Sequence, residues 1–77
     1  MQDYTIDVGR IEELQMISDI QELENIFQRA KSAIVCGALV NLGRKDQSGK
    51  INIFEKITIL PDLTQYRNTV FKYLKTD

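Results

Sequence analysis

The side chains best suited to binding a charged ligand are gathered in one short polar stretch, GRKDQSGK at residues 43–50. Arg44, Lys45 and Lys50 outnumber Asp46 there, and such a basic tip could contact phosphate oxygens. Glycine, serine and aspartate also form turns, and an apolar run lies on each side of the stretch. We therefore favour a solvent-exposed hairpin turn, and keep nucleic-acid contact as the alternative role of the three bases.

A nucleotide-binding loop is excluded at the same stretch. The spacing of its glycines and Lys50 is GxxxxxGK, which is one residue longer than the phosphate-loop pattern. Ile51 stands where that pattern requires serine or threonine, and a strand is predicted where a helix should follow. The stretch therefore predicts no cofactor site.

The chain has few residues of the kinds that nucleophilic catalysis and metal binding require. The chain has one cysteine, Cys36, and no histidine that could act as its base or join it in a structural zinc site. Asp3, Asp7 and Glu12 could approach a hard cation, but the spacing of a calcium-binding loop is absent. We expect no catalytic residue, no metal site and no cofactor.

Charge is distributed unevenly along a chain whose net charge is −1. Residues 1–25 hold seven acids and one base, whereas residues 26–77 hold nine bases and four acids. The overall balance argues against general binding of polyanions. We expect the acidic part and the basic part mainly to attract each other across the fold.

Length and composition suit one small globular domain, residues 1–77, because 43% of the residues are apolar and 27% are charged. No apolar run approaches the roughly 20 residues of a membrane-spanning helix. The first residues, MQDYTIDVGR, lack the basic start and the apolar core of a signal peptide. Since Cys36 has no second cysteine to pair with, we expect a cytoplasmic protein without membrane contact.

The N-terminal part of the chain predicts a strand followed by an ambiguous segment. Tyr4, Ile6 and Val8 alternate with polar residues, which predicts a strand over residues 4–8. Residues 9–17 fit either a helix, because they are rich in glutamate, or a turn at their first two residues.

A helix over residues 18–34 is the clearest element. Ser18 is predicted as its N-cap, and Gln21 completes the sequence pattern of a capping box. Ile11 and Leu14 would fall on the opposite face of a longer helix, so we expect the element to begin near residues 16–18. The apolar residues recur at intervals of four and three and predict one stripe packed on a sheet: Met16, Ile20, Leu23, Phe27, Ala30 and Ile34.

Two further strands are predicted over residues 33–42 and 50–60. The first is apolar on both faces, which is typical of a strand buried on both sides, with Cys36 as a small buried residue. Glu55 interrupts the isoleucine face of the second strand, and a β-bulge could form there. Pro61 is expected to end that strand, before a last helix capped by Asp62 or Thr64.

The predicted order is therefore β-α-β-β-α. It indicates an α+β fold, a two-layer sandwich of a three-stranded sheet with two helices on one face. The other face of the sheet would be uncovered, and we expect Phe54 and Leu60 to add to its apolar surface. An apolar surface of that extent favours burial against a second copy of the chain.

These observations predict a non-catalytic protein-interaction or regulatory module that forms a homodimer. The alternative is a small nucleic-acid-binding protein that uses the hairpin tip at residues 43–50 and the basic last helix. Salt separates the two functions, because phosphate contacts weaken steeply as salt rises and an apolar interface responds little.

Overall fold

The computed structural model describes residues 3–74, which form three helices and a three-stranded mixed sheet. The α+β class predicted from the sequence is confirmed, but the predicted order lacked one helix. The elements, in chain order, are β1 (Tyr4–Asp7), α1 (Val8–Met16), α2 (Ile20–Val35), β2 (Val40–Lys45), β3 (Ile51–Ile57) and α3 (Leu60–Lys72).

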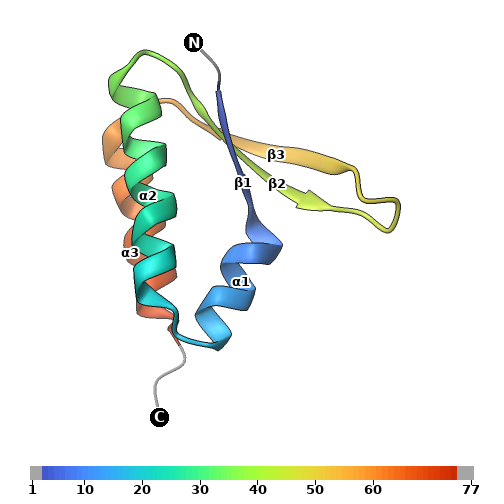
Figure 1. Ribbon diagram of the computed structural model, residues 1–77. Helices are drawn as coiled ribbons and strands as arrows, with labels where there is room; N and C mark the ends of the chain where they lie inside the picture. Colours follow the sequence, from blue (N-terminus) through green and yellow to red (C-terminus); the bar gives the residue numbers. More distant parts are fainter. Residues whose placement is uncertain (1–2, 75–77) are drawn as a thin grey trace.

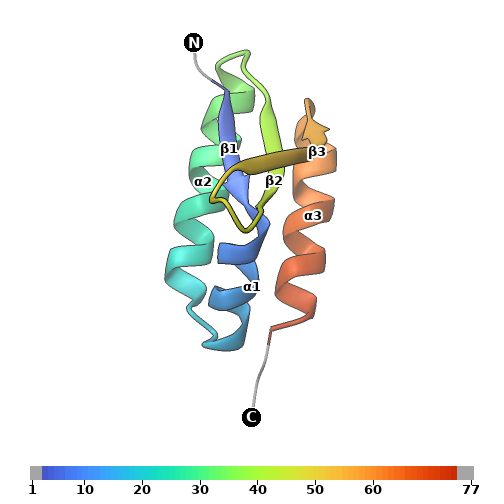
Figure 2. The ribbon, with the colours of Figure 1, turned by 90° about the vertical axis from the view of Figure 1, so that its right-hand side faces the viewer.

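The strands lie in the order β1-β2-β3, with β1 parallel to β2 and β2 antiparallel to β3. Helices α2 and α3 pack against each other on one side of the sheet, and α1 continues directly from the end of β1 (Figure 1). The view turned by 90° shows the β2–β3 hairpin in front of these helices (Figure 2). Among the described residues, no helix covers the other side of the sheet.

The core lies between the sheet and the helices. Val40 pairs with Ile57 across β2 and β3, and both side chains are buried on the helix side. The described residues with buried apolar side chains are Ile6, Ile11, Leu14, Leu23, Ile26, Phe27, Ala30, Val40, Leu42, Ile57, Leu63 and Val70.

Helix α1 occupies the segment that the sequence left ambiguous. The side chain of Asp7 accepts a hydrogen bond from the backbone N–H of Gly9 at 3.0 Å, and so caps the helix at its first turn. Ile11 and Leu14 are both buried. The break expected near residues 16–18 is confirmed, because α1 ends at Met16 and α2 begins at Ile20.

The prediction that Ser18 caps the second helix was wrong by one residue. Ser18 lies in the turn between α1 and α2 with a backbone φ of 53°. That left-handed conformation places Asp19 at the N-cap, where its carboxylate accepts from the N–H of Glu22 at 3.2 Å. Serine and aspartate are both good N-cap residues, and the conformation of the turn between the helices makes Asp19 the cap instead of Ser18.

The predicted stripe of α2 is buried only in its middle. Leu23, Phe27 and Ala30 are buried, and Ile26 joins them. Met16 and Ile20 are 67% and 46% exposed, because they lie at the α1–α2 turn, beyond the end of the sheet. The helical spacing is therefore correct for the central turns and wrong at the start.

The strand predicted over residues 33–42 was wrong for most of its length. Helix α2 continues through Val35, and β2 begins at Val40. Gly37, with a φ of 92°, ends the helix, since its N–H donates to Ile34 O and the N–H of Ala38 donates to Ala33 O. This double bond pattern is the Schellman motif, which favours glycine at its left-handed position.

The strand predicted over residues 50–60 is shorter than expected, and the last helix begins earlier. Strand β3 ends at Ile57, and α3 begins at Leu60 with Pro61 in its first turn. Ile59 is the N-cap residue, with no side-chain cap bond, so neither Asp62 nor Thr64 has the predicted capping role. Proline suits this position, because the first N–H groups of a helix have no intrahelical acceptor.

Candidate functional site

The most exposed part of the sheet is the outer half of the β2–β3 hairpin, which we call the hairpin arm and define as residues 44–56. It projects away from the helices (Figure 1) and crosses in front of β1 in the perpendicular view (Figure 2). Most of β3, residues 52–56, is exposed, although its side chains alternate between two faces. Residues 44–50 and 52–56 are all exposed, which leaves the arm available for contact with a second molecule.

A β-bulge sets the direction of the arm. Leu42 is paired with Glu55 and the next residue, Gly43, with Ile53, so Phe54 is the extra residue of β3. Such an insertion bends a strand and increases its twist. A Cβ atom on Gly43 would collide with Ile51 Cγ2 and would lie 3.0 Å from Ile53 Cδ1. Glycine is therefore needed at position 43 for Ile51 and Ile53 to pack against the backbone there. The register shift confirms the irregularity expected beside Glu55.

The tip of the arm is held by Asp46. Its Oδ1 accepts from the N–H of Ser48 at 2.9 Å, from Ser48 Oγ at 2.6 Å and from the N–H of Lys50 at 3.1 Å. Asn52 donates to the other carboxylate oxygen at 3.3 Å, and Gly49 has a left-handed φ of 87°. The Ser48 hydroxyl, followed by the Asn52 amide, lowers the pKa of Asp46 to about 2. The tip is thus an ordered turn rather than a flexible basic finger.

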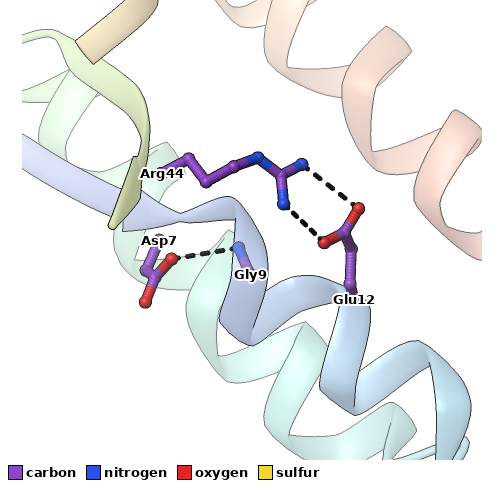
Figure 3. A network of polar contacts seen from close by, with 4 residues as sticks. All are labelled: Asp7, Gly9, Glu12 and Arg44. Carbon is purple, nitrogen blue, oxygen red and sulfur yellow. Dashed lines mark hydrogen bonds and ion pairs between the residues drawn. The ribbon is translucent and has the colours of Figure 1, made fainter. Parts of the chain in front are cut away.

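A bidentate ion pair, which we call the brace, holds the base of the arm against α1. The guanidinium of Arg44 donates to Glu12 through Nη1 at 2.8 Å and through Nη2 at 3.2 Å (Figure 3). The same view shows the Asp7–Gly9 cap at the start of α1, close to this pair (Figure 3). The hydrogen bond from Arg44 lowers the pKa of Glu12, and the pair raises the pKa of Arg44. The brace therefore persists until the pH falls through the lowered pKa of Glu12.

Tyr66 of α3 lies close enough to this brace to feel its charges. Its ring packs edge-on against Phe27, with ring centroids 5.7 Å apart. Burial, and then the negative charges of Glu12 and Glu55, raise the pKa of Tyr66 to about 12. The phenol is consequently neutral over the physiological range, and its ring contributes to the packing between α2 and α3.

The three bases predicted to share the tip are divided between different roles. Arg44 is held by Glu12 at the base of the arm, 54% exposed but already paired. In the part of the chain that the structure describes, Lys45 and Lys50 form no ion pair. The same holds there for Lys56, which pairs with Asn41 across the sheet and so lies on its helix-free face. The arm thus presents three unpaired ammonium groups.

The two predicted interface residues lie in different places. Phe54 is 60% exposed in the middle of the arm, beside Ile53 at 42%. Leu60 belongs to α3, where it lines a depression of about 560 Å³ between α2 and α3 together with Phe27 and Leu63. Leu60 therefore does not add to the helix-free face of the sheet.

The helix-free face itself is less apolar than the sequence suggested. Paired residues share a face of the sheet, which places Thr5, Asn41 and Lys56 together on this side. Apolar side chains are present farther along the same face, where Ile53 lies opposite Gly43. The expectation of a broad apolar face was wrong because it counted residues 33–39, which are helix and turn.

The residues considered for covalent or metal chemistry are dispersed. Cys36, predicted to be buried, is exposed at the C-cap of α2. Asp3 accepts from the N–H of Leu39 at 3.2 Å, whereas Asp7 caps α1 and Glu12 pairs with Arg44. Residues 3–74 contain no group of three or more His, Cys, Asp or Glu side chains placed to hold a metal ion. Over the same residues, no helix has the length and apolar character needed to span a bilayer.

A second exposed apolar surface was missed by the sequence analysis. Met16, Ile17, Ile20 and Tyr73 are 67%, 69%, 46% and 65% exposed. They come from the α1–α2 turn and the end of α3, which lie at the same end of the molecule in both views (Figures 1 and 2). The sequence did contain one indication of this surface. Met16, Ile17 and Ile20 are large apolar residues on either side of a predicted helix break, and a buried stripe cannot continue across such a break.

Comparisons with protein-family models, with curated proteins and with solved structures gave no match to this chain. The geometry of the arm and of the second apolar surface is therefore the basis for the functional assignment.

Proposed function

We propose that the protein is a non-catalytic protein-interaction module and that the hairpin arm is its binding surface. One observation carries the proposal: the arm exposes Phe54 and Ile53 on the part of β3, residues 52–56, where every residue is exposed. Large exposed aromatic and aliphatic residues on a projecting element are typical of contact sites. The ordered Asp46 turn and the Arg44–Glu12 brace reduce the conformational freedom lost on binding.

A homodimer remains part of the proposal, with a changed interface. The sequence placed the contact on a broad apolar face that included Leu60, whereas the exposed apolar residues of the sheet are concentrated in the arm. The bulge at Phe54 and the lysine beside Glu55 also protect the β3 edge against simple strand pairing. The side chains of the arm, rather than its backbone edge, are the expected contacts.

Nucleic-acid binding is the second candidate, favoured by the three unpaired lysines on the arm, Lys45, Lys50 and Lys56. It ranks lower because Arg44, the base best suited to a phosphate, is committed to Glu12. An exposed Phe54 serves either function, since bases stack on aromatic rings.

Sedimentation velocity at increasing protein concentration tests the proposal. We expect the wild type to self-associate and Phe54→Glu to remain a monomer with an unchanged helical circular-dichroism signal, because the substitution puts a charge into the contact. Val35→Glu is the matched control, since Val35 is 66% exposed at the far end of α2. A wild-type monomer that binds single-stranded RNA or DNA with a steep salt dependence would replace the first function by the second.

A further inference from the structure

We propose that the partner of the hairpin arm is the end of a second copy of this chain, where Met16, Ile17, Ile20 and Tyr73 are exposed. We call this surface the acidic end and define it as residues 13–22 with the last turn of α3. The inference rests on the proposed function, because it names what the arm binds. In a symmetric dimer each copy would insert its arm against the acidic end of the other.

Charge is the first reason for this assignment. Because Arg44 is already paired with Glu12, the arm offers a partner three lysines, Lys45, Lys50 and Lys56, against two acids, Asp46 and Glu55. Residues 13–22 carry three acids, Glu13, Asp19 and Glu22, and no base. Arg10 lies 3.7 Å from Glu13, and Lys72 adds a base near Tyr73. Oppositely charged surfaces steer association and select the partner.

The second reason is that each surface has an apolar centre with charges around it. Phe54 and Ile53 supply the apolar centre on the arm. On the acidic end, Met16 and Tyr73 line one shallow depression together with Glu12 and Gln15, and the opening has a volume of about 390 Å³. An aromatic side chain set into a depression with polar groups at its margin is the usual arrangement of an interface hot spot.

The third reason is that the middle and the tip of the arm lie apart from the acidic end within one molecule (Figure 1). The Arg44–Glu12 brace fixes the base of the arm, and from there the arm projects sideways, whereas the acidic end lies at the bottom of the molecule (Figures 1 and 3). Asp46 keeps the tip folded back on itself. Two complementary surfaces that are held apart in one copy can be buried together by a second copy.

Arm-to-arm contact is the main alternative symmetric dimer, and charge disfavours it. Two arms placed together would bring Lys45, Lys50 and Lys56 of one copy near the same lysines of the other. Exchange between arm and acidic end removes this repulsion and buries both exposed apolar groups. It also forms two equivalent contacts in one closed dimer, as two-fold symmetry requires.

Two variants, each altered on one surface, test the exchange. Phe54→Glu changes the arm, and Ile17→Glu changes the acidic end at a residue that is 69% exposed and outside the helices. Each should weaken wild-type self-association by about tenfold or more, the loss expected of a central contact residue. Val35→Glu should leave it unchanged, and circular dichroism should show the same helix content in all four proteins.

Mixing the two variants provides the decisive result. In the mixed dimer, the intact arm of Ile17→Glu meets the intact acidic end of Phe54→Glu, which restores one of the two contacts. A fluorophore on Cys36, the single cysteine and an exposed one, allows sedimentation of one variant to be followed in the presence of the other. We expect the labelled variant to associate about tenfold more tightly with the other variant than with itself.

Each other result overturns the inference in a distinguishable way. If Phe54→Glu weakens association while Ile17→Glu does not, the arm binds another surface, and the proposed function survives without this partner site. If both variants weaken association but the mixture is no better than either alone, the two residues do not face each other. If the wild type stays monomeric at tens of micromolar, the inference fails together with the homodimer.

Discussion

Asp46 shows how one side chain can determine whether a basic loop is a mobile contact or a fixed turn. Its carboxylate accepts hydrogen bonds from Ser48, Lys50 and Asn52. From the sequence it was counted as one negative charge among three bases. In the fold it organises the turn, and Lys45 and Lys50 on either side of the turn are exposed to solvent.

A prediction follows for the ionisation of this carboxyl. In NMR titrations, Asp46 should titrate at about 2 in the wild type, and Ser48→Ala should raise its pKa toward the ordinary 3.8, because Ser48 is the largest cause of the shift. Since the folded-state pKa is lowered, the turn is favoured above 3.8 and this contribution is lost as the pH falls toward 2. A midpoint near 3.8 in both proteins would mean that the carboxylate does not hold the tip.

Arg44 and Glu12 illustrate what sequence cannot supply at this scale. Both residues were noted separately, one as a candidate phosphate contact and the other among acids near the N-terminus. Their pairing depends on the path of β2 beside the start of α1, which brings together residues 32 positions apart. Local patterns identify the residue types, whereas the tertiary fold determines which of them remain available.

At the scale of elements, the local rules succeeded where one periodicity dominates. Leu23, Phe27 and Ala30 were correctly assigned to the core because the helical repeat is regular there. The run AIVCGALVNL was misread because an apolar stretch fits a buried strand or the end of a buried helix equally well. Gly37 was the available signal, since a glycine just beyond an apolar helix commonly ends it.

The bulged hairpin gives the sharpest prediction for an element. Gly43→Ala should destabilise the fold by about 1–3 kcal/mol, because the added methyl group meets Ile51 and Ile53 on the facing strand. Gly49→Ala is the control for side-chain crowding, because a Cβ at Gly49 meets nothing within 4 Å, although its left-handed φ adds some backbone strain.

Urea denaturation measures both effects on the free energy of unfolding. We also expect Gly43→Ala to displace the amide NMR signals of Phe54 and its neighbours, since the bulge must rearrange around the new methyl group. Equal stability of Gly43→Ala and the wild type would show that the strands can separate there at no cost, and that the bulge does not depend on glycine.

For the whole molecule, the uneven charge of the sequence is partly used inside the fold. The ion pairs Arg44–Glu12, at 2.8 Å, and Arg67–Glu24, at 3.6 Å, each join an acid from residues 1–25 to a base from the remainder. This confirms the expected attraction between the two parts. Among residues 3–74, it leaves the three lysines of the arm and Asp19 and Glu22 of the acidic end without an ion pair, and the proposed dimer would bring these together.

The sequence predicted the α+β class and an exposed Phe54, but not the second surface. Met16 and Ile20 were assigned to a core stripe. Their exposure follows from the α1–α2 turn and the end of α3 lying beyond the sheet. No local pattern contains that information, because it depends on how far the helices extend past the strands they cover.

The contact between the arm and the acidic end can be observed directly by NMR. The sample is an equal mixture of one copy labelled with ¹³C at methyl groups and one unlabelled copy, with only intermolecular effects detected. We predict nuclear Overhauser effects from the ring protons of Phe54 in the unlabelled copy to the methyl groups of Met16 and Ile17 in the labelled copy. Effects from the Phe54 ring to the methyl groups of Ile51 and Ile53 of the other copy, with none to Met16 or Ile17, would contradict the exchange and place arm against arm.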